Sequence, residues 1–368
     1  MRSFPIPRPL MGLLLPLLAS HPTAPRPPGH WQQLATTPKT AGRSECGVAA
    51  VQGRLYVLGG DGPAQPVEVL DVATAHWQAK APTPVPLHHF QAVAYHDQLY
   101  VLAAFSTGNF PDQEPAAHAY RYDPRTNAWQ ALAGLPAARR RAGAGASAHG
   151  DKLYLVAGIA HGHRSGTTNQ FDAYDPHTDT WAALPDAPHK RDHCQAVALG
   201  DKLYVVGGRN TSYHEPGNFM AFFSQTVRAV DCYDFKTGRW STLAAELPQG
   251  TGGGTAAVLN GKLFYMGGER ATAALPNGPQ KDVYYLDPTT GSHWAKAADL
   301  HLARNGVGSA VLGERLYVAG GAAGPPPPGG RPPGAPPTGP PAPGRPPGPP
   351  AGGGPGSNPA GLAVEVFH

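Results

Sequence analysis

One six-residue pattern recurs six times along this chain of 368 residues, and it limits the possible folds more than any other feature. Each copy is Leu, an aromatic residue, two further apolar residues and two small residues; the copies begin at Leu55, Leu99, Leu153, Leu203, Leu263 and Leu316. A short unbroken apolar run predicts a strand buried on both faces, and the small residues predict a point where backbones approach closely. Such repeats are expected to bury their cores against one another.

A second strand, a turn and a tryptophan follow each apolar run. The tryptophans lie 46 to 59 residues apart, at Trp31, Trp77, Trp129, Trp181, Trp240 and Trp294. The Asp-Pro pairs at Asp123, Asp175 and Asp287 are turn chemistry, because proline presets φ and aspartate caps the turn. With 47 glycines, 43 prolines and only 15% charged residues, the composition suits short strands joined by many turns. This spacing is typical of the four-stranded blade of a propeller.

The small-residue doublet, the Tyr-Asp-Pro turn and the spaced tryptophan resemble the kelch motif. The second and third copies depart from the doublet, with Ala103-Ala104 and Ala157-Gly158. The resemblance implies an all-β fold, a six-bladed kelch-type β-propeller over residues 30–368. His30-Trp31-Gln32 matches the fourth strand of the other units, and residues 364–367 match a third strand. We therefore expect an N-terminal strand to join the C-terminal blade and close the ring.

Two segments fall outside the repeat. In residues 1–20, Arg2 and Arg8 precede an apolar stretch from Leu10 to Leu18, which is too short to span a bilayer. This pattern predicts a signal peptide and a secreted or periplasmic protein, with a disordered tail as the alternative. Residues 21–29 are expected to be a linker. Residues 322–361 are dominated by Pro and Gly and are expected to form a disordered insertion in the last blade.

The repeat register predicts a functional site at one mouth of the central channel. Positions twelve residues before each signature Leu carry four arginines: Arg43, Arg141, Arg191 and Arg304. Glu45, His88, His89, Asp192 and His193 lie one or two residues further on, and Arg209 and Glu269 follow their doublets. A surplus of guanidinium groups predicts an anionic or polyhydroxyl small molecule, a glycan or an acidic protein segment as ligand. Alternatively, each Arg braces a neighbouring blade by bonding loop carbonyls.

Three functions are compatible with these residues. We favour a noncatalytic binding module, because no complete catalytic set is recognised. The resemblance to N-acetylneuraminate mutarotase implies an enzyme in which Glu45, Glu269, His89 and His193 supply an acid and a base. The resemblance to the propeller of galactose oxidase implies a copper oxidase, but no Tyr occupies either predicted ring at the mouth. Intracellular kelch propellers often serve as substrate adaptors, a role that an export signal disfavours.

Metals, cofactors and nucleic acids are not expected. The pairs His161-x-His163 and His88-His89 invite a metal interpretation, but with 17 histidines chance neighbours are common. We therefore predict no metal and no cofactor. The net charge of +4 comes without a Lys/Arg run, so nucleic acid is not predicted as a partner. The chain is expected to be a monomer without a membrane span.

The register also predicts the state of the cysteines. Cys46 and Cys194 fall at equivalent positions in opposite blades, so the channel separates them. Cys232 shares a blade with Cys194 but lies two strands away, at about 9–10 Å. A disulfide needs Cα atoms within about 7 Å. We predict three free, largely buried thiols.

Overall fold

The computed structural model describes residues 1, 29–273, 277–323 and 362–368. The predicted signal peptide, most of the linker and most of the Pro/Gly insertion lie outside these residues. Among the described residues, no helix has the length and apolar character needed to cross a membrane.

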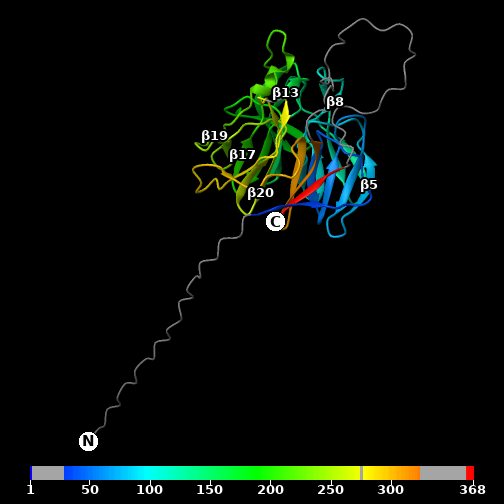
Figure 1. Ribbon diagram of the computed structural model, residues 1–368, viewed down its shortest axis with the longest axis vertical. Coiled ribbons are helices and arrows are strands. Elements are labelled where there is room, and N and C mark those ends of the chain that lie inside the picture. Colours follow the sequence, from blue (N-terminus) through cyan, green and yellow to red (C-terminus); the bar gives the residue numbers. More distant parts are fainter. Residues whose placement is uncertain (2–28, 274–276, 324–361) are drawn as a thin grey trace.

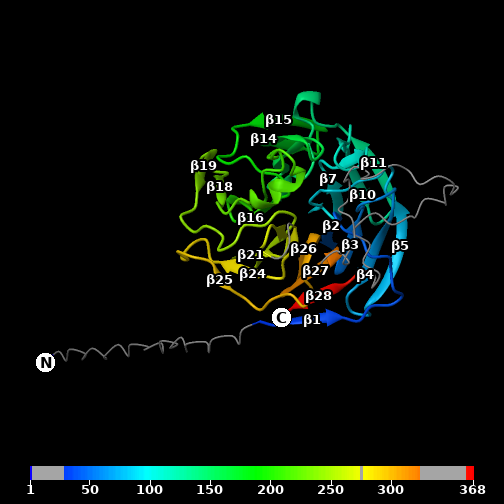
Figure 2. The same ribbon diagram turned by 45° about the horizontal axis from the view of Figure 1, so that its top comes forward.

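Six antiparallel four-stranded sheets surround a common axis, and Figures 1 and 2 show them as the blades of one propeller. Blade 1 contains β2 (Gly47–Val51), β3 (Arg54–Leu58), β4 (Pro66–Asp71) and β5 (His76–Pro82). Blade 2 contains β6 (Val93–Tyr95), β7 (Gln98–Val101), β10 (Ala119–Asp123) and β11 (Ala128–Leu132). Blade 3 contains β12 (Gly145–His149), β13 (Lys152–His161), β14 (Ser165–Asp175) and β15 (Thr180–Leu184).

The other three blades repeat this order. Blade 4 contains β16 (Gln195–Leu199), β17 (Lys202–Val206), β18 (Asp231–Asp234) and β19 (Arg239–Thr242). Blade 5 contains β20 (Thr255–Leu259), β21 (Lys262–Met266), β24 (Val283–Leu286) and β25 (Ala295–Lys296). Blade 6 contains β26 (Arg304–Leu312), β27 (Arg315–Ala323), β28 (Val364–Phe367) and β1 (Trp31–Leu34), with Trp31 opposite Phe367. Strands β1 and β28, far apart in the sequence, thus lie side by side in one sheet, as Figure 2 shows.

Several short elements lie outside the six blades. Strands β8 (Phe105–Thr107) and β9 (Glu114–Pro115) form one small hairpin, and β22 (Glu269–Arg270) and β23 (Gly278–Pro279) form another. The 3-10 helices are η1 (Ala137–Arg139) and η2 (Phe219–Ser224). In Figure 1, β8 and the end of β13 lie at the end of the molecule opposite the C-terminus, which we call the loop-bearing end.

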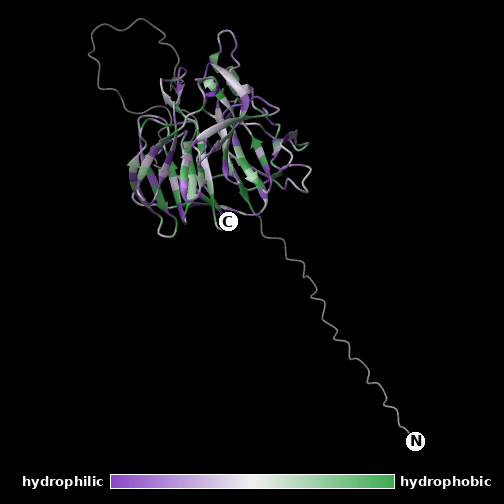
Figure 3. Cartoon of the chain, turned by 180° about the vertical axis from the view of Figure 1, so that it is seen from behind, coloured by the Kyte–Doolittle hydropathy of each residue, from purple (hydrophilic) through white to green (hydrophobic). Residues whose placement is uncertain are grey.

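The repeat produces the blades for the reasons that the sequence suggests. The apolar runs form second strands such as β3 and β17, each with four successive buried residues. Apolar residues lie in the strands throughout the molecule (Figure 3). The turn aspartates accept a hydrogen bond from the backbone N–H two residues on: Asp71, Asp123, Asp175, Asp234 and Asp287. The six-bladed, all-β architecture predicted from the repeat is confirmed.

The tryptophans join neighbouring blades. Five indole N–H groups donate to a carbonyl of the preceding blade at 2.8–3.4 Å: those of Trp31, Trp129, Trp181, Trp240 and Trp294. The buried Trp77 has no hydrogen-bond partner for its Nε1 within the described part of the chain. A tryptophan in the fourth strand, or next to it in blade 5, thus packs a large apolar ring against the neighbouring blade and, in five cases, adds a hydrogen bond.

Four buried arginines brace the inside of single blades: Arg43, Arg141, Arg191 and Arg304. Each donates to the carbonyl of the first small residue of its own doublet at 2.6–3.2 Å, on Gly59, Ala157, Gly207 and Gly320. Each also pairs with a carboxylate on the third strand of the same blade at 2.6–3.6 Å, on Glu68, Asp172, Asp231 and Glu365. A buried guanidinium needs such partners, because burying an unpaired charge is costly.

The expectation that Arg43, Arg141, Arg191 and Arg304 face one channel mouth is therefore wrong. Each guanidinium bonds groups inside its own blade, and the side chains are 0–4% exposed, although the Nε of Arg43, Arg191 and Arg304 has no hydrogen-bond partner among the described residues. The alternative is correct in that these arginines bond backbone carbonyls, but it is wrong about the partner, because the bonds lie within one blade and do not reach a neighbouring blade. An anion cannot reach these guanidinium groups without breaking the blade core.

The cysteines are as predicted. All three lie within the described residues, and Cys46, Cys194 and Cys232 are free and buried. Burial raises the pKa of Cys46 and of Cys194 to about 11. The reactive thiolate form is therefore scarce at neutral pH.

Removing one arginine brace is expected to destabilise the propeller strongly. Arg191→Met leaves the carboxylate of Asp231 buried without its cation, which costs about 3–5 kcal/mol of unfolding free energy. The exposed neighbour Lys190 provides the control, since Lys190→Met leaves the blade core intact. Urea denaturation followed by tryptophan fluorescence measures both; equal midpoints for Arg191→Met and wild type would refute the bracing role.

Thiol accessibility gives a second check on the fold. We expect almost no reaction of the native protein with an aromatic disulfide reagent, because each thiol is buried. Three thiols per chain should react after denaturation without reductant. Fewer than three would mean that a disulfide forms and that the strand register is incorrect.

Candidate functional site

A closed ring of backbone hydrogen bonds surrounds the propeller axis. One residue from each blade takes part, just before the first strand or, in blade 6, near its start: Glu45, His89, Gly143, His193, Gly253 and Gly306. Each N–H donates to the carbonyl of the ring residue in the preceding blade, at 2.6–2.9 Å, and Glu45 donates to Gly306. We call these six residues the axial ring. It fixes how closely the blades approach one another at the axis.

All six residues of the axial ring have a left-handed backbone, with φ between +52° and +65°. Glycine adopts this conformation freely, and it fills the ring in blades 3, 5 and 6. Glu45, His89 and His193 carry side chains there, which costs about 1–2 kcal/mol each. Non-glycine residues in such conformations concentrate at functional sites. The three strained residues are therefore the first candidates for function.

The axis encloses little free space. A cavity of about 30 Å³ is lined by the axial ring and by Cys46, Phe90, Ala144, Cys194, Gln195, Gly254 and Val307. A second cavity of about 30 Å³ adjoins it, lined by Gln91 and Gln195 among others. The amide of Gln91 bonds Ala146 and Ala196 and so links blades 2, 3 and 4. A water molecule or a metal ion fits such a space, and a monosaccharide does not.

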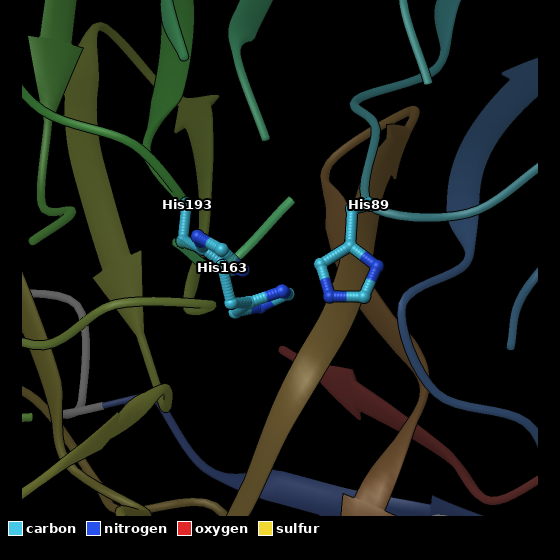
Figure 4. Close-up of side chains that lie close together, drawn as sticks. All are labelled: His89, His163 and His193. Carbon is cyan, nitrogen blue, oxygen red and sulfur yellow. The ribbon is translucent and has the colours of Figure 1, made fainter. Parts of the chain in front are cut away.

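Three imidazoles from three blades lie close together, as Figure 4 shows, and two of them, His89 and His193, line this cavity. His89 and His193 come from the axial ring, and His163 comes from the turn between β13 and β14. Their ring centroids are 5.1–5.2 Å apart, and one nitrogen of each lies within 4.8 Å of the others. All three side chains are buried. We call His89, His163 and His193 the axial triad.

Each member of the axial triad has its Nδ1 engaged by an outer partner. Nδ1 of His193 lies 2.6 Å from Oδ1 of Asp192, and Nδ1 of His163 lies 3.1 Å from Oε1 of Gln113. Nδ1 of His89 lies 2.6 Å from Nδ1 of His88. The buried Nε2 of His193 has no hydrogen-bond partner among the described residues. Outer partners of this kind fix the tautomer and orientation of metal-binding imidazoles.

The triad is held in its neutral form. Burial lowers the pKa of His89 to about 4 and lowers the pKa of His163 and His193 well below the usual value. Arg209 lowers the pKa of His193 further, after burial. Neutral imidazoles have the free lone pair that a metal ion requires.

Carboxylates outnumber cations around the triad. Asp192 accepts hydrogen bonds from Thr167 Oγ1 at 2.6 Å and Thr211 N at 3.0 Å. Glu269 pairs with Arg209 at 2.8 Å and accepts a bond from Asn305. Burial, and then the nearby Glu269, raise the pKa of Glu45 to about 8.

The centre therefore favours a cation rather than the anion expected from the sequence. Arg209, which was predicted to bind ligand, is neutralised by Glu269 and covered by the rings of Phe222 and Phe223. Oε2 of Glu45 lies 3.8 Å from Nε2 of His89. Glu45 and Asp192, which were expected to offset the positive charge of the arginines, lie instead beside the neutral imidazoles of His89 and His193.

Aromatic loops cover the triad at the loop-bearing end. The rings of Phe105, Phe110 and Phe222 lie 4.9–6.3 Å from the ring of His163. The backbone of His163 is fixed by a bond from its N–H to the carbonyl of Pro111. These aromatic side chains pack the loops and the triad, leaving the imidazoles shielded from solvent.

The structure brings together seven of the predicted site residues: Glu45, His88, His89, Asp192, His193, Arg209 and Glu269. The selection from the repeat register omitted His163, Gln113 and Asp61. His163 belongs to the His161-x-His163 pair, but only the fold of the β13–β14 hairpin carries it over the axis. The sequence feature that could have identified His163 is the apolar run of blade 3, which continues past the doublet toward a glycine turn at Gly162.

The strain in the axial ring predicts an unusual order of stabilities. Glu45→Gly and Glu45→Ala both remove the carboxylate, but only glycine relieves the positive φ. The glycine variant is expected to be more stable by about 1 kcal/mol. Thermal and urea unfolding of the pair measure the difference; an alanine variant as stable as the glycine variant would contradict the ring conformation.

Comparison with known proteins identifies relatives over most of the chain. The sequence model of the KLHDC2/KLHL20/DRC7 Kelch-repeats domain matches residues 28–208 and 105–321. Kelch-like protein terF of Aspergillus terreus is 27% identical over 80% of this chain and 65% of its own length. Kelch-like protein 35 of Mus musculus is 28% identical over 74% of this chain and 41% of its own length. The chain thus spans less than two thirds of these relatives.

A solved structure has the same architecture. The structure of YjhT superposes with a TM-score of 0.66 at 20% identity and covers 78% of this chain and 93% of its own. At this identity the likeness concerns the fold alone.

Proposed function

Because the chain belongs to the kelch-repeat family, whose fold hosts many functions, we propose its function from the axial site: it binds a divalent transition metal through His89, His163 and His193. The observation that carries this proposal is the convergence of three buried, neutral imidazoles from three blades, one with an unpartnered Nε2. Imidazole ligands suit zinc, copper, iron and nickel.

The surroundings of the triad support a metal centre rather than a packed core. Asp192, Gln113 and His88 each occupy the Nδ1 of one imidazole, which leaves Nε2 for the metal. Metal–nitrogen bonds of about 2.0–2.1 Å would draw the three imidazoles together. Glu45 or a water in the axial cavity supplies a fourth ligand. Three protein ligands with one further position is the arrangement of metal sites that act on substrates.

The acidic or carbohydrate ligand expected from the sequence loses its support at this site. Four of the predicted arginines are buried in blade cores, and the axial cavity has room for an ion or water. A mutarotase or a galactose oxidase-like enzyme gains no support from the geometry of the triad. Export through residues 1–20 remains a prediction; it would load the centre outside the cytoplasm.

Metal binding tests the proposal directly. The demetallated full chain is titrated with Co²⁺ and with Zn²⁺, and binding is followed by the visible absorption of Co²⁺ and by calorimetry. Wild type is expected to bind and to gain thermal stability, by about 2.7 kcal/mol at a free metal concentration 100 times the Kd. His163→Gln should abolish the visible spectrum, and Asp192→Asn should weaken affinity about 10–100-fold.

The matched control is His161→Gln. His161 lies two residues from His163 in the same hairpin but is exposed, so its loss should leave affinity and spectrum unchanged. Equal binding by His163→Gln and wild type, or no binding by wild type, would refute the proposal.

A further inference from the structure

A second group of potential ligands lies on the other side of His89. Asp61, His88 and His89 each place a ligand atom within 4.8 Å of the others. Asp61 follows the glycine doublet of blade 1, and His88 precedes the first strand of blade 2. We call Asp61, His88 and His89 the lateral cluster. It shares His89 with the axial triad.

The ligand atoms of the lateral cluster are oriented by their neighbours. Oδ1 of Asp61 faces two imidazole nitrogens, at 3.5 Å from Nδ1 of His88 and 3.8 Å from Nδ1 of His89. Oδ2 accepts a hydrogen bond from Ser44 Oγ at 3.2 Å, which fixes the carboxylate plane. The backbone of His88 exchanges hydrogen bonds with Phe105 at 2.9–3.1 Å. One carboxylate oxygen and two nitrogens thus point at a common position.

His89 offers a different nitrogen to each group. Its Nδ1 faces His88 and Asp61, while Figure 4 shows its other nitrogen on the side of His163. An imidazole ring that loses its proton binds one metal through each nitrogen. Resting on the proposed axial metal, we infer that His89 bridges two divalent ions, one held by the axial triad and one by the lateral cluster. The two ions would lie about 6 Å apart, given metal–nitrogen bonds of 2.0–2.1 Å.

Charge balance favours two ions over one. Four carboxylates surround these imidazoles, those of Glu45, Asp61, Asp192 and Glu269, and the guanidinium of Arg209 pairs with one of them. Because the pKa of Glu45 is raised to about 8, this carboxylate is ionised when metal binding displaces its proton, and the four ionised carboxylates then leave a buried surplus of negative charge, which is costly. A single divalent ion reduces this surplus. Two divalent ions with a bridging imidazolate neutralise it.

The two positions differ in access. The axial triad is buried, whereas the side chain of Asp61 is 36% exposed. The lateral ion is therefore expected to exchange with solvent and to be removed first by a chelator. Wild type loaded with Zn²⁺ should release one ion quickly and the other slowly.

Stoichiometry distinguishes the bridged pair from a single axial metal. The demetallated full chain is loaded with Cu²⁺, passed through a desalting column and assayed for copper by mass spectrometry. Wild type and the control Glu114→Gln, which alters an exposed carboxylate in β9, are expected to retain two ions per chain. Asp61→Asn should retain one, and circular dichroism checks that it is folded.

Magnetic coupling tests the bridge itself. Two Cu²⁺ ions joined by imidazolate couple their spins, so the wild-type EPR signal should fall well below two spins per chain and a half-field transition should appear. Asp61→Asn should give the full signal of one uncoupled ion. One ion in wild type, or two ions with uncoupled spins, would overturn the bridge. If wild type retains one ion and His163→Gln retains none, the axial site is supported without the bridge. If wild type retains no copper, the axial site is refuted as well.

Discussion

The closed ring of six backbone hydrogen bonds at the axis determines the geometry on which everything else depends. Each bond joins one blade to the preceding one at 2.6–2.9 Å, so the ring sets the separation of the blades where they are closest. The ring backbone is left-handed at all six positions, and the three ring residues that are not glycine, Glu45, His89 and His193, line the cavity at the axis. Had all six been glycine, the propeller would close equally well but carry no chemistry there. The side chains at Glu45, His89 and His193 are therefore additions to a ring that does not need them.

The sequence predicts the fold well because each repeat carries its own strand, turn and blade-contact residues. It also identifies which positions are equivalent, but equivalence does not say which way a side chain points. Arg191 and His193 lie two residues apart, yet the intervening turn sends Arg191 into the blade core and His193 to the axis. The carboxylate that captures Arg191 is Asp231, on a strand some 40 residues later. The repeat register does not reveal this pairing, because the two residues are far apart in the sequence. The arginines were therefore expected to be free to bind a ligand at the channel mouth.

His163 shows the other limit of prediction from sequence. The repeat register describes what blades share, whereas His163 lies in a hairpin that is particular to blade 3. There β13 is 10 residues long and continues past the doublet to His161, β14 is 11 residues long, and Ala157 adopts φ +62° where blades 1, 4, 5 and 6 have glycine. Turn length and the packing of Phe105, Phe110 and Phe222 then decide that the ring points inward. A local departure from the repeat is thus where the structure places the third imidazole.

Strain and charge at the axis point to the same role for a bound cation. Without one, the folded chain carries side chains in left-handed conformations, an unpartnered Nε2 on His193 and more buried carboxylates than cations. Each feature raises the free energy of the folded state, and none is required by the ring. A cation coordinated by the imidazoles provides a partner for the Nε2 of His193 and offsets the charge of the buried carboxylates. It also explains why side chains occupy strained positions that glycine could fill. The unfolded chain has no such preformed site, so the binding free energy of the metal adds to the stability of the propeller.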